Sequence, residues 1–211
     1  MIADYDNEYS KFFDVAVEGS MPVLATRSLV LFPGIISPIL IGRKQSLSLL
    51  KYVNKLEDPI FTVFCQKDNN VEKPEEKDLY RYGVYARLMK VIDMPGPGNN
   101  VTAIVQAMGR CELRKITRLT PYIVGDVAPA REDKPEADDE EFKTASEDLK
   151  TSAFNYIRDN EDLPDEAKLA LENIHNDVIA LNFVCTNLPF NVADKIELLT
   201  MNSLKDRLIG T

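Results

Sequence analysis

The sequence predicts an α+β fold in which a β-rich lobe is followed by an α-helical lobe, and three observations lead to this prediction. Residues 21–129 contain short runs of β-branched and aromatic residues separated by proline and glycine. Residues 130–141 contain seven acidic residues and no large apolar side chain, so they are expected to form a solvated acidic linker. Residues 142–211 carry apolar side chains at three- and four-residue steps, which is the helical period. The first twenty residues, 1–20, are polar and acidic with a few aromatics and are expected to form an N-terminal arm.

The β-rich lobe is predicted from apolar runs bounded by turn residues. Residues 94–100 read Met-Pro-Gly-Pro-Gly-Asn-Asn and combine proline with glycine, which favours a hairpin between two strands. Between Arg43 and Leu56 the apolar residues switch to helical spacing. The predicted elements of this lobe are strands at 23–24, 29–31, 35–41, 60–65, 82–93, 101–108, 111–119 and 122–127, and a helix at 43–56.

The second lobe is predicted to be helical throughout. Asp162 is a candidate cap for a helix that begins at Pro164, and Asn191 is a candidate cap for a later helix after the break at Pro189. An apolar stripe is expected to continue through this lobe at Leu169, Ile174, Val178, Leu181 and Cys185, and a last short helix is expected at 204–208.

Charge and composition exclude several classes of partner. The chain carries a formal net charge of −9, and its basic residues are scattered, so nucleic acid and anionic membranes are unlikely partners. No apolar run is long enough to span a bilayer, and the acidic start is the reverse of a signal peptide, so a cytoplasmic location is expected. The three cysteines are far apart and are expected to be buried free thiols.

The residues needed for catalysis are missing from the sequence. The single histidine, His175, falls in a stretch predicted to be helical and has no nucleophile motif beside it. The three cysteines lack the paired spacing of a zinc site. Residues 42–46 read Gly-Arg-Lys-Gln-Ser but lack the upstream glycine of a phosphate-binding loop. We therefore predict no enzyme activity for this chain alone, no cofactor and no metal.

Two stretches carry a resemblance to a known family. Residues 22–34 read Pro-Val-Leu-Ala-Thr-Arg-Ser-Leu-Val-Leu-Phe-Pro-Gly, and a Gly-Arg pair follows at 42–43 before the predicted helix. Residues 177–208 include Asn187-Leu188-Pro189 and end near Arg207-Leu208. In this order the two stretches closely resemble the amino-terminal domain of the ATP-dependent Lon proteases, although Ala25-Thr26 replaces the family's usual Pro-Leu.

The resemblance implies a β-rich lobe of pseudo-barrel type, followed by a helical bundle. It also implies a non-catalytic domain that binds unfolded or tagged polypeptides and contacts other Lon subunits in a full-length hexamer. In that family an ATPase module and a Ser–Lys peptidase module follow the domain, and this sequence has no Walker motif. The chain is therefore expected to be an excised domain or a standalone relative, and the end at Gly210-Thr211 favours excision.

Two turns supply the candidate polypeptide-binding residues, because exposed apolar side chains and open sheet edges bind unfolded chains. At the first turn Leu31 and Phe32 are better explained as core residues, and the hairpin is better explained as a mobile loop. Arg27 is expected to pair with a carboxylate. The alternative function is a standalone pseudo-barrel module that binds a small ligand or RNA. The candidate binding residues are Leu31, Phe32 and Pro33 at the first turn, and Met94, Pro95 and Pro97 at the hairpin tip.

Overall fold

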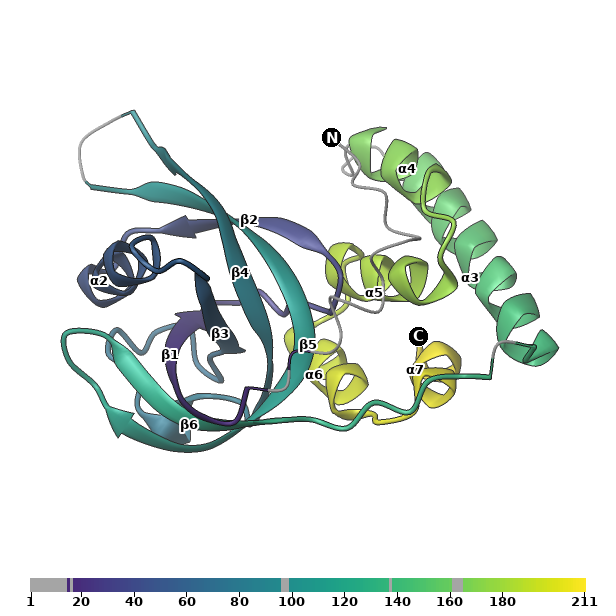
Figure 1. Ribbon diagram of the computed structural model, residues 1–211. Helices are drawn as coiled ribbons and strands as arrows, with labels where there is room; N and C mark the ends of the chain where they lie inside the picture. The colour runs from purple at the N-terminus through teal and green to yellow at the C-terminus, as the bar shows by residue number, and fades with distance from the viewer. Residues whose placement is uncertain (1–14, 16, 96–98, 137, 161–164) are drawn as a thin grey trace. The chain divides into compact units, whose positions relative to one another are not determined.

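The computed structural model describes residues 15, 17–95, 99–136, 138–160 and 165–211 (Figure 1). They divide between Ala130 and Arg131 into a β unit and a helical unit. The predicted α+β class is confirmed, since one unit is built on a six-stranded sheet and the other on helices. Among the described residues, none of the helices is long and apolar enough to cross a membrane.

The β unit is a sheet that closes on itself. Its elements are β1 (Gly19–Thr26), β2 (Ile36–Ile41), α2 (Lys44–Val53), β3 (Ile60–Cys65), the 3₁₀ helix η1 (Glu76–Asp78), β4 (Tyr82–Asp93), β5 (Val101–Arg118) and β6 (Ile123–Pro129). The strand order is β2-β5-β4-β3-β1-β6, and β6 also pairs with β5, so the last five strands form a closed ring. β1 and β3 are parallel, and every other pair is antiparallel.

The long strand β5 makes this closure possible. β4 occupies one of its edges, while β2 pairs with its amino half and β6 with its carboxyl half. The sequence predicted two strands at 101–108 and 111–119, and this was wrong, because the chain continues through Gly109 and Arg110 as one strand of 18 residues. Register shifts along the β4 and β6 pairings supply the bends that a closed sheet requires.

The predicted strand at 29–31 is also wrong. Ser28 takes a left-handed conformation with φ 56°, which turns the chain out of the sheet directly after β1. Residues 29–31 then follow an irregular path, and Val30 and Leu31 are buried without joining a strand. A second turn follows at Gly34, whose φ of 85° favours glycine.

The core of the β unit fills the interior of the closed sheet. Gly83 permits close approach of β4 to β3, because a Cβ atom there would lie 2.2 Å from the carbonyl oxygen of Val63. The buried core residues come from β1, β3, β4, β5, β6 and the residue after η1: Met21, Val23, Ala25, Phe64, Leu79, Tyr85, Met108, Cys111, Leu113, Ile123 and Val127.

The helical unit contains five helices. They are α3 (Glu140–Asp159), α4 (Asp165–Glu172), α5 (Asp177–Asn187), α6 (Val192–Thr200) and α7 (Leu204–Gly210). Asn191 caps α6 as predicted, since its side chain accepts a hydrogen bond from the amide of Asp194 at 2.9 Å. The proposed cap Asp162 and Pro164 lie outside the described residues.

Two expectations for the helical unit need correction. The apolar stripe is interrupted between α4 and α5, and Leu169 is 59% exposed, because helical spacing alone does not show which face is buried. The predicted acidic linker at residues 130–141 is not wholly solvated. Asp133 and Ser203 form an isolated parallel β-bridge, and the Glu132 carboxylate lies 2.9 Å from the guanidinium of the fully buried Arg207. A buried cation needs a carboxylate partner, and this one comes from the acidic segment.

Candidate functional site

The first predicted binding turn lies in the interior of the β unit. Leu31 and Phe32 are 2% and 0% exposed, and Pro33 is also buried. The turn is hydrogen-bonded to β5, where the Gly34 amide donates to the carbonyl of Ala107 at 2.9 Å. A polypeptide cannot reach these three side chains in this conformation. Leu31 and Phe32 are core residues, as the core interpretation predicted, and Pro33 is buried next to them in the chain.

The second predicted turn lies at the surface. Met94 is 44% exposed and Pro95 is exposed, while Pro97 lies outside the described residues. The Met94 amide donates to the carbonyl of Asn100 at 3.1 Å, which confirms the hairpin. The hydroxyl of Thr102 lies 3.2 Å from the Met94 sulfur, so the Met94 side chain folds back over β5.

Met94 is continuous with an apolar surface that spans three strands. Leu40 on β2 lies opposite Thr102 on β5, which in turn lies opposite Ile92 on β4. Residues opposite each other in a sheet point to the same face, so these side chains form a row. Leu40 is 68% exposed and Ile92 is 41% exposed. We call this surface the outer apolar face and define it by Pro38, Leu40, Ile92, Met94 and Ile104.

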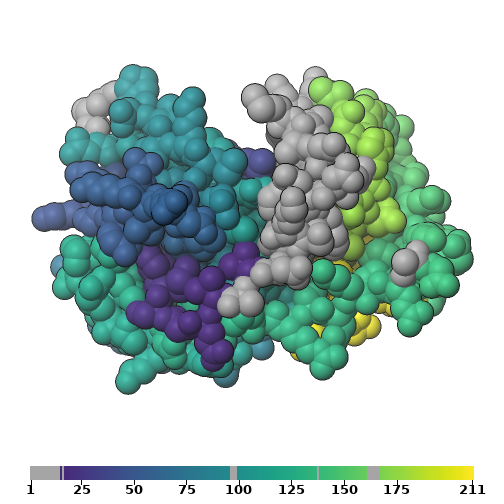
Figure 2. Space-filling model, in the orientation of Figure 1, coloured from purple at the N-terminus to yellow at the C-terminus, as the bar shows by residue number. Residues whose placement is uncertain are grey.

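The outer apolar face lies toward the projecting end of the β4–β5 hairpin, which extends past α2 (Figure 1). In the space-filling view the hairpin forms the upper left of the β unit, with α2 below it (Figure 2). The sequence did not identify Leu40 and Ile92 because β2 and β4 carry apolar residues on both faces here. Ile39 and Ile41 are buried while Leu40 between them is exposed. A run that is apolar at every position does not show which side faces water.

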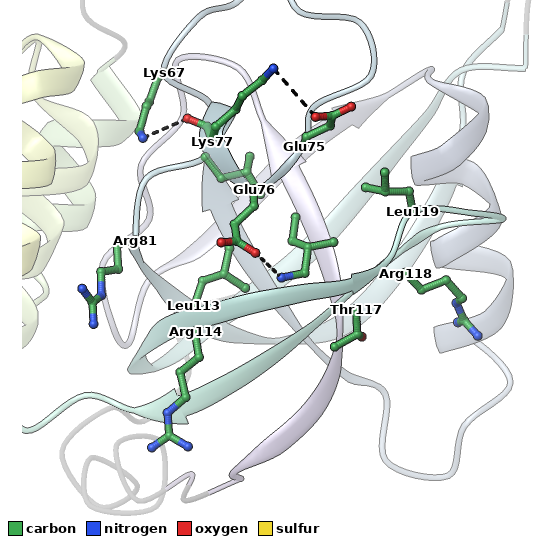
Figure 3. Close-up of a pocket in the computed structure, with 12 residues that line it drawn as sticks. Lys67, Glu75, Glu76, Lys77, Arg81, Leu113, Arg114, Thr117, Arg118 and Leu119 are labelled. Atoms are coloured by element: carbon green, nitrogen blue, oxygen red, sulfur yellow. Dashed lines mark hydrogen bonds and ion pairs between the residues drawn. The ribbon is translucent and has the colours of Figure 1, made fainter.

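A groove of about 970 Å³ lies in the β unit between the loop that carries η1 and the carboxyl half of β5 (Figure 3). Glu76 points to the centre of this groove, where its carboxylate accepts a hydrogen bond from the Ile116 amide at 2.8 Å. Basic side chains surround it: Lys67, Lys77, Arg81, Arg114 and Arg118.

The positive charge of this groove is largely compensated. Arg81 pairs with Glu112, Arg114 pairs with Glu18 at 2.5 Å, and Lys77 lies 3.8 Å from Glu75. The guanidinium of Arg118 lies 4.9 Å from the centre of the Tyr122 ring and forms a cation–π contact. Three of the five cations therefore face a carboxylate of the protein, and two carboxylates, Glu75 and Glu76, belong to the lining of the groove itself.

A second cavity of the β unit, of about 470 Å³, lies beside β2, and we call it the edge cavity. One wall is the run from Pro38 to Gly42, and the other is the end of β1 with the turn that follows it. Two guanidinium groups line it. Arg43 donates to the carbonyl of Ala25 at 2.9 Å, and Arg27 pairs with Glu72 at 2.6 Å, as predicted for Arg27. Burial lowers the pKa of Arg43, and the nearby positive charge of Arg27 lowers it further.

The residues with catalytic chemistry do not converge on a site. His175 is exposed in the connection between α4 and α5, so its predicted position within a helix is wrong. Burial raises the pKa of each thiol at Cys65, Cys111 and Cys185, which keeps the reactive thiolate rare. All three are buried free thiols, as predicted. Within the described ranges no three His, Cys, Asp or Glu residues gather closely enough to hold a metal ion.

Comparison with known proteins matches almost the whole chain to one family. The model of the ATP-dependent protease La (LON) substrate-binding domain matches residues 20–209. The Lon protease of Flavobacterium johnsoniae is 33% identical over 91% of this chain, and that of Parabacteroides distasonis is 31% identical over 97%. These matches span 23% and 24% of the relatives, so the chain covers about a quarter of their length.

Two solved structures share the fold. The N-terminal domain of Mycobacterium avium complex Lon protease superposes with a TM-score of 0.66 over 90% of this chain and 94% of that chain, at 17% identity. A Lon N-terminal domain protein from Xanthomonas campestris gives a TM-score of 0.60 over 90% of this chain and 95% of that chain, also at 17% identity. At this identity the likeness shows the fold alone.

Proposed function

The chain belongs to the family of ATP-dependent protease La (Lon) substrate-binding domains, and from this premise we propose that it binds unfolded or tagged polypeptides through its outer apolar face. Members of the family are a non-catalytic part of a larger protease, so the proposed role of this chain is to recognise polypeptide substrates. The ATPase and peptidase steps would belong to other parts of a full-length protein. Contact with other Lon subunits and a cytoplasmic location fit the same role.

The observation that carries this proposal is the exposure of Leu40 on β2 and Ile92 on β4, which flank Thr102 of β5 in one row, together with the exposed Met94 just after β4. Unfolded chains differ from folded ones mainly in their exposed hydrophobic side chains, and such chains bind to exposed apolar surface. The flexible thioether of Met94 suits a surface that meets many sequences, because it adapts to partners of different shape.

The test is titration calorimetry with a reduced and carbamidomethylated lactalbumin, which stays unfolded, against the same protein in its native form. We expect binding to the unfolded form only. The double variant Ile92→Ser and Met94→Ser is expected to weaken that binding by about 2 kcal/mol, because two apolar side chains lose their buried contact.

The control is Leu169→Ser, which removes an apolar side chain of α4 in the helical unit that is more exposed than Ile92 or Met94. It is expected to bind the unfolded protein as tightly as the original chain does. Equal loss in the control and in the double variant would show that the outer apolar face is not the contact surface. Binding of native lactalbumin as tight as that of the unfolded form would argue against recognition of unfolded chains.

A further inference from the structure

We propose that the edge cavity receives an acidic side chain of a bound polypeptide, whose extended backbone adds to the open edge of β2. This inference rests on the proposed polypeptide binding and names the class of segment that is preferred. The preferred segment is extended, apolar on one side, and carries an Asp or Glu.

The backbone of β2 is suited to accept another strand. Among the described strands β2 pairs with β5 alone, so its second edge carries no strand. The Ala107 amide donates to the carbonyl of Ile35 at 2.8 Å, and the alternation of an antiparallel pair then directs the backbone groups of Ile36, Pro38 and Leu40 to the open edge. Pro38 lacks an amide hydrogen, so the open edge offers the amides of Ile36 and Leu40 and the carbonyls of all three residues, and an added strand would pair on either side of Pro38.

The edge cavity lies along this same edge. The run from Pro38 to Gly42 forms one wall, and consecutive residues of a strand can line a cavity only if their backbone borders it. The opposite wall includes Leu24, which is 2% exposed, and Leu29, which is half-buried. Leu40 lines the cavity and also belongs to the outer apolar face, so a segment on the edge could contact both.

The charge of the cavity selects an anion. Its lining, which lies wholly within the described residues, includes Arg27 and Arg43 and contains neither Asp nor Glu. Glu72 pairs with Arg27, but its side chain is 73% exposed and is not part of the lining. Two guanidinium groups with one exposed carboxylate leave a local excess of positive charge on a protein whose net charge is −9. A carboxylate placed between them would form charge-assisted hydrogen bonds.

The groove next to η1 also has more basic than acidic residues in its lining, but two carboxylates of the protein, Glu75 and Glu76, already lie in it. The Glu76 carboxylate accepts the Ile116 amide of β5 at the centre of the groove, where an acidic side chain of a ligand would meet it. The edge cavity is therefore the better candidate for an acidic side chain.

The experiment measures fluorescence anisotropy with labelled ten-residue peptides that are acetylated and amidated, so that no terminal charge contributes. One peptide alternates Val and Thr around a central Asp, a second has Asn in place of Asp, and a third carries the Asp with N-methyl groups on alternate backbone amides. We expect the Asp peptide to bind about tenfold tighter than the Asn peptide, which corresponds to one charge-assisted hydrogen bond. The N-methylated peptide is expected to bind at least tenfold more weakly, because it cannot complete the strand pairing.

The protein variants are Arg43→Gln and Arg27→Gln. Arg43→Gln loses its bond to Ala25, so its fold is checked by circular dichroism, whereas Arg27→Gln removes only an exposed ion pair and is expected to fold normally. Both are expected to bind the Asp and Asn peptides equally. The matched control is Arg158→Gln in α3, which removes an exposed arginine that also has a carboxylate partner and should retain the preference.

Three outcomes would overturn the inference. A preference for Asp that persists in Arg27→Gln and Arg43→Gln would exclude these guanidinium groups. Binding of Asp and Asn peptides with equal affinity by the original chain, while unfolded lactalbumin still binds, would overturn the acidic preference and leave the proposed function intact. Absence of binding by every peptide and by unfolded lactalbumin would overturn both.

Discussion

Arg207 is the residue that joins most of the helical unit. It is fully buried, and its guanidinium lies 2.9 Å from Glu132 and 3.1 Å from the side-chain oxygen of Asn182. It also donates to the carbonyls of Leu198 and Met201, each at 3.1 Å. One side chain therefore connects the acidic segment, α5 and the residues at the end of α6. A buried cation is tolerated only when it is paired and hydrogen-bonded in this way.

Arg207→Met is expected to lower the free energy of unfolding by about 3–5 kcal/mol, because Glu132 and two carbonyl oxygens would lose their buried donor. Urea unfolding followed by circular dichroism at 222 nm measures the change. Arg158→Met serves as the control, since Arg158 pairs with Asp159 at the surface, and no measurable loss is expected there. An equally small loss for Arg207→Met would show that its bonds contribute little.

Four helices of the second unit begin at polar caps. Side-chain oxygens of Asp139, Asn176, Asn191 and Ser203 accept backbone amides at the starts of α3, α5, α6 and α7. α5, α6 and α7 have 11, 9 and 7 residues and are short enough that each depends on its cap and on packing of its buried residues. In the β unit the chain changes direction at turns instead, and Ser28 and Gly34 adopt a positive φ at two of these turns.

Asn191→Ala is expected to lower the free energy of unfolding by about 1 kcal/mol, because the Asp194 amide at the start of α6 loses its acceptor. Asn191→Ser is the matched control and is expected to retain most of the stability, since a hydroxyl oxygen accepts the same bond and places no second carboxylate beside Asp194. The urea midpoint of each variant, at an unchanged m-value, measures the change. If the Asn191→Ser variant were as unstable as Asn191→Ala, the capping interpretation would fail.

Over the whole chain, burial leaves three neutral thiols in two separate units. Cys65 and Cys111 lie in the β unit, and Cys185 lies in α5. Burial raises the pKa of each thiol above its unfolded value. A group whose pKa is raised on folding contributes its stability below the unfolded pKa, which is about 8.5 for cysteine, and loses that contribution as the pH rises toward the folded pKa.

The free energy of unfolding is therefore expected to fall as the pH rises from 8 to 9.5, by up to about 1.4 kcal/mol per pH unit for each thiol. Urea unfolding at half-unit intervals measures this slope. A variant with alanine at Cys65, Cys111 and Cys185 is expected to show a flatter slope. The comparison separates the effect of the thiols from that of Lys195, because Lys195 is present in both chains and burial lowers its pKa in both. Identical slopes for the two chains would contradict this account.

Much of the fold was predictable because its signals are local. The strands at 60–65 and 82–93 appear with the bounds that the sequence predicted, and the helix at 44–53 lies within the predicted range. Hydrophobic period, turn residues and caps act over a few neighbouring residues, so one sequence displays them. The exposure of the candidate binding residues could be predicted only in part. Met94 and Pro95 are exposed, whereas Leu31 and Phe32 are buried, because burial depends on which segments pack over a turn.

The sequence by itself determined the α+β class, the likeness to Lon substrate-binding domains and the buried character of the cysteines, because composition and ordered motifs carry this information. Only the tertiary structure decided that β5 closes the sheet, that Leu40 and Ile92 share an exposed row, and that Arg207 pairs with Glu132 across 75 positions. The physical reason is that contacts between distant segments depend on strand register and on packing. The residue pattern of one segment alone predicts neither of these.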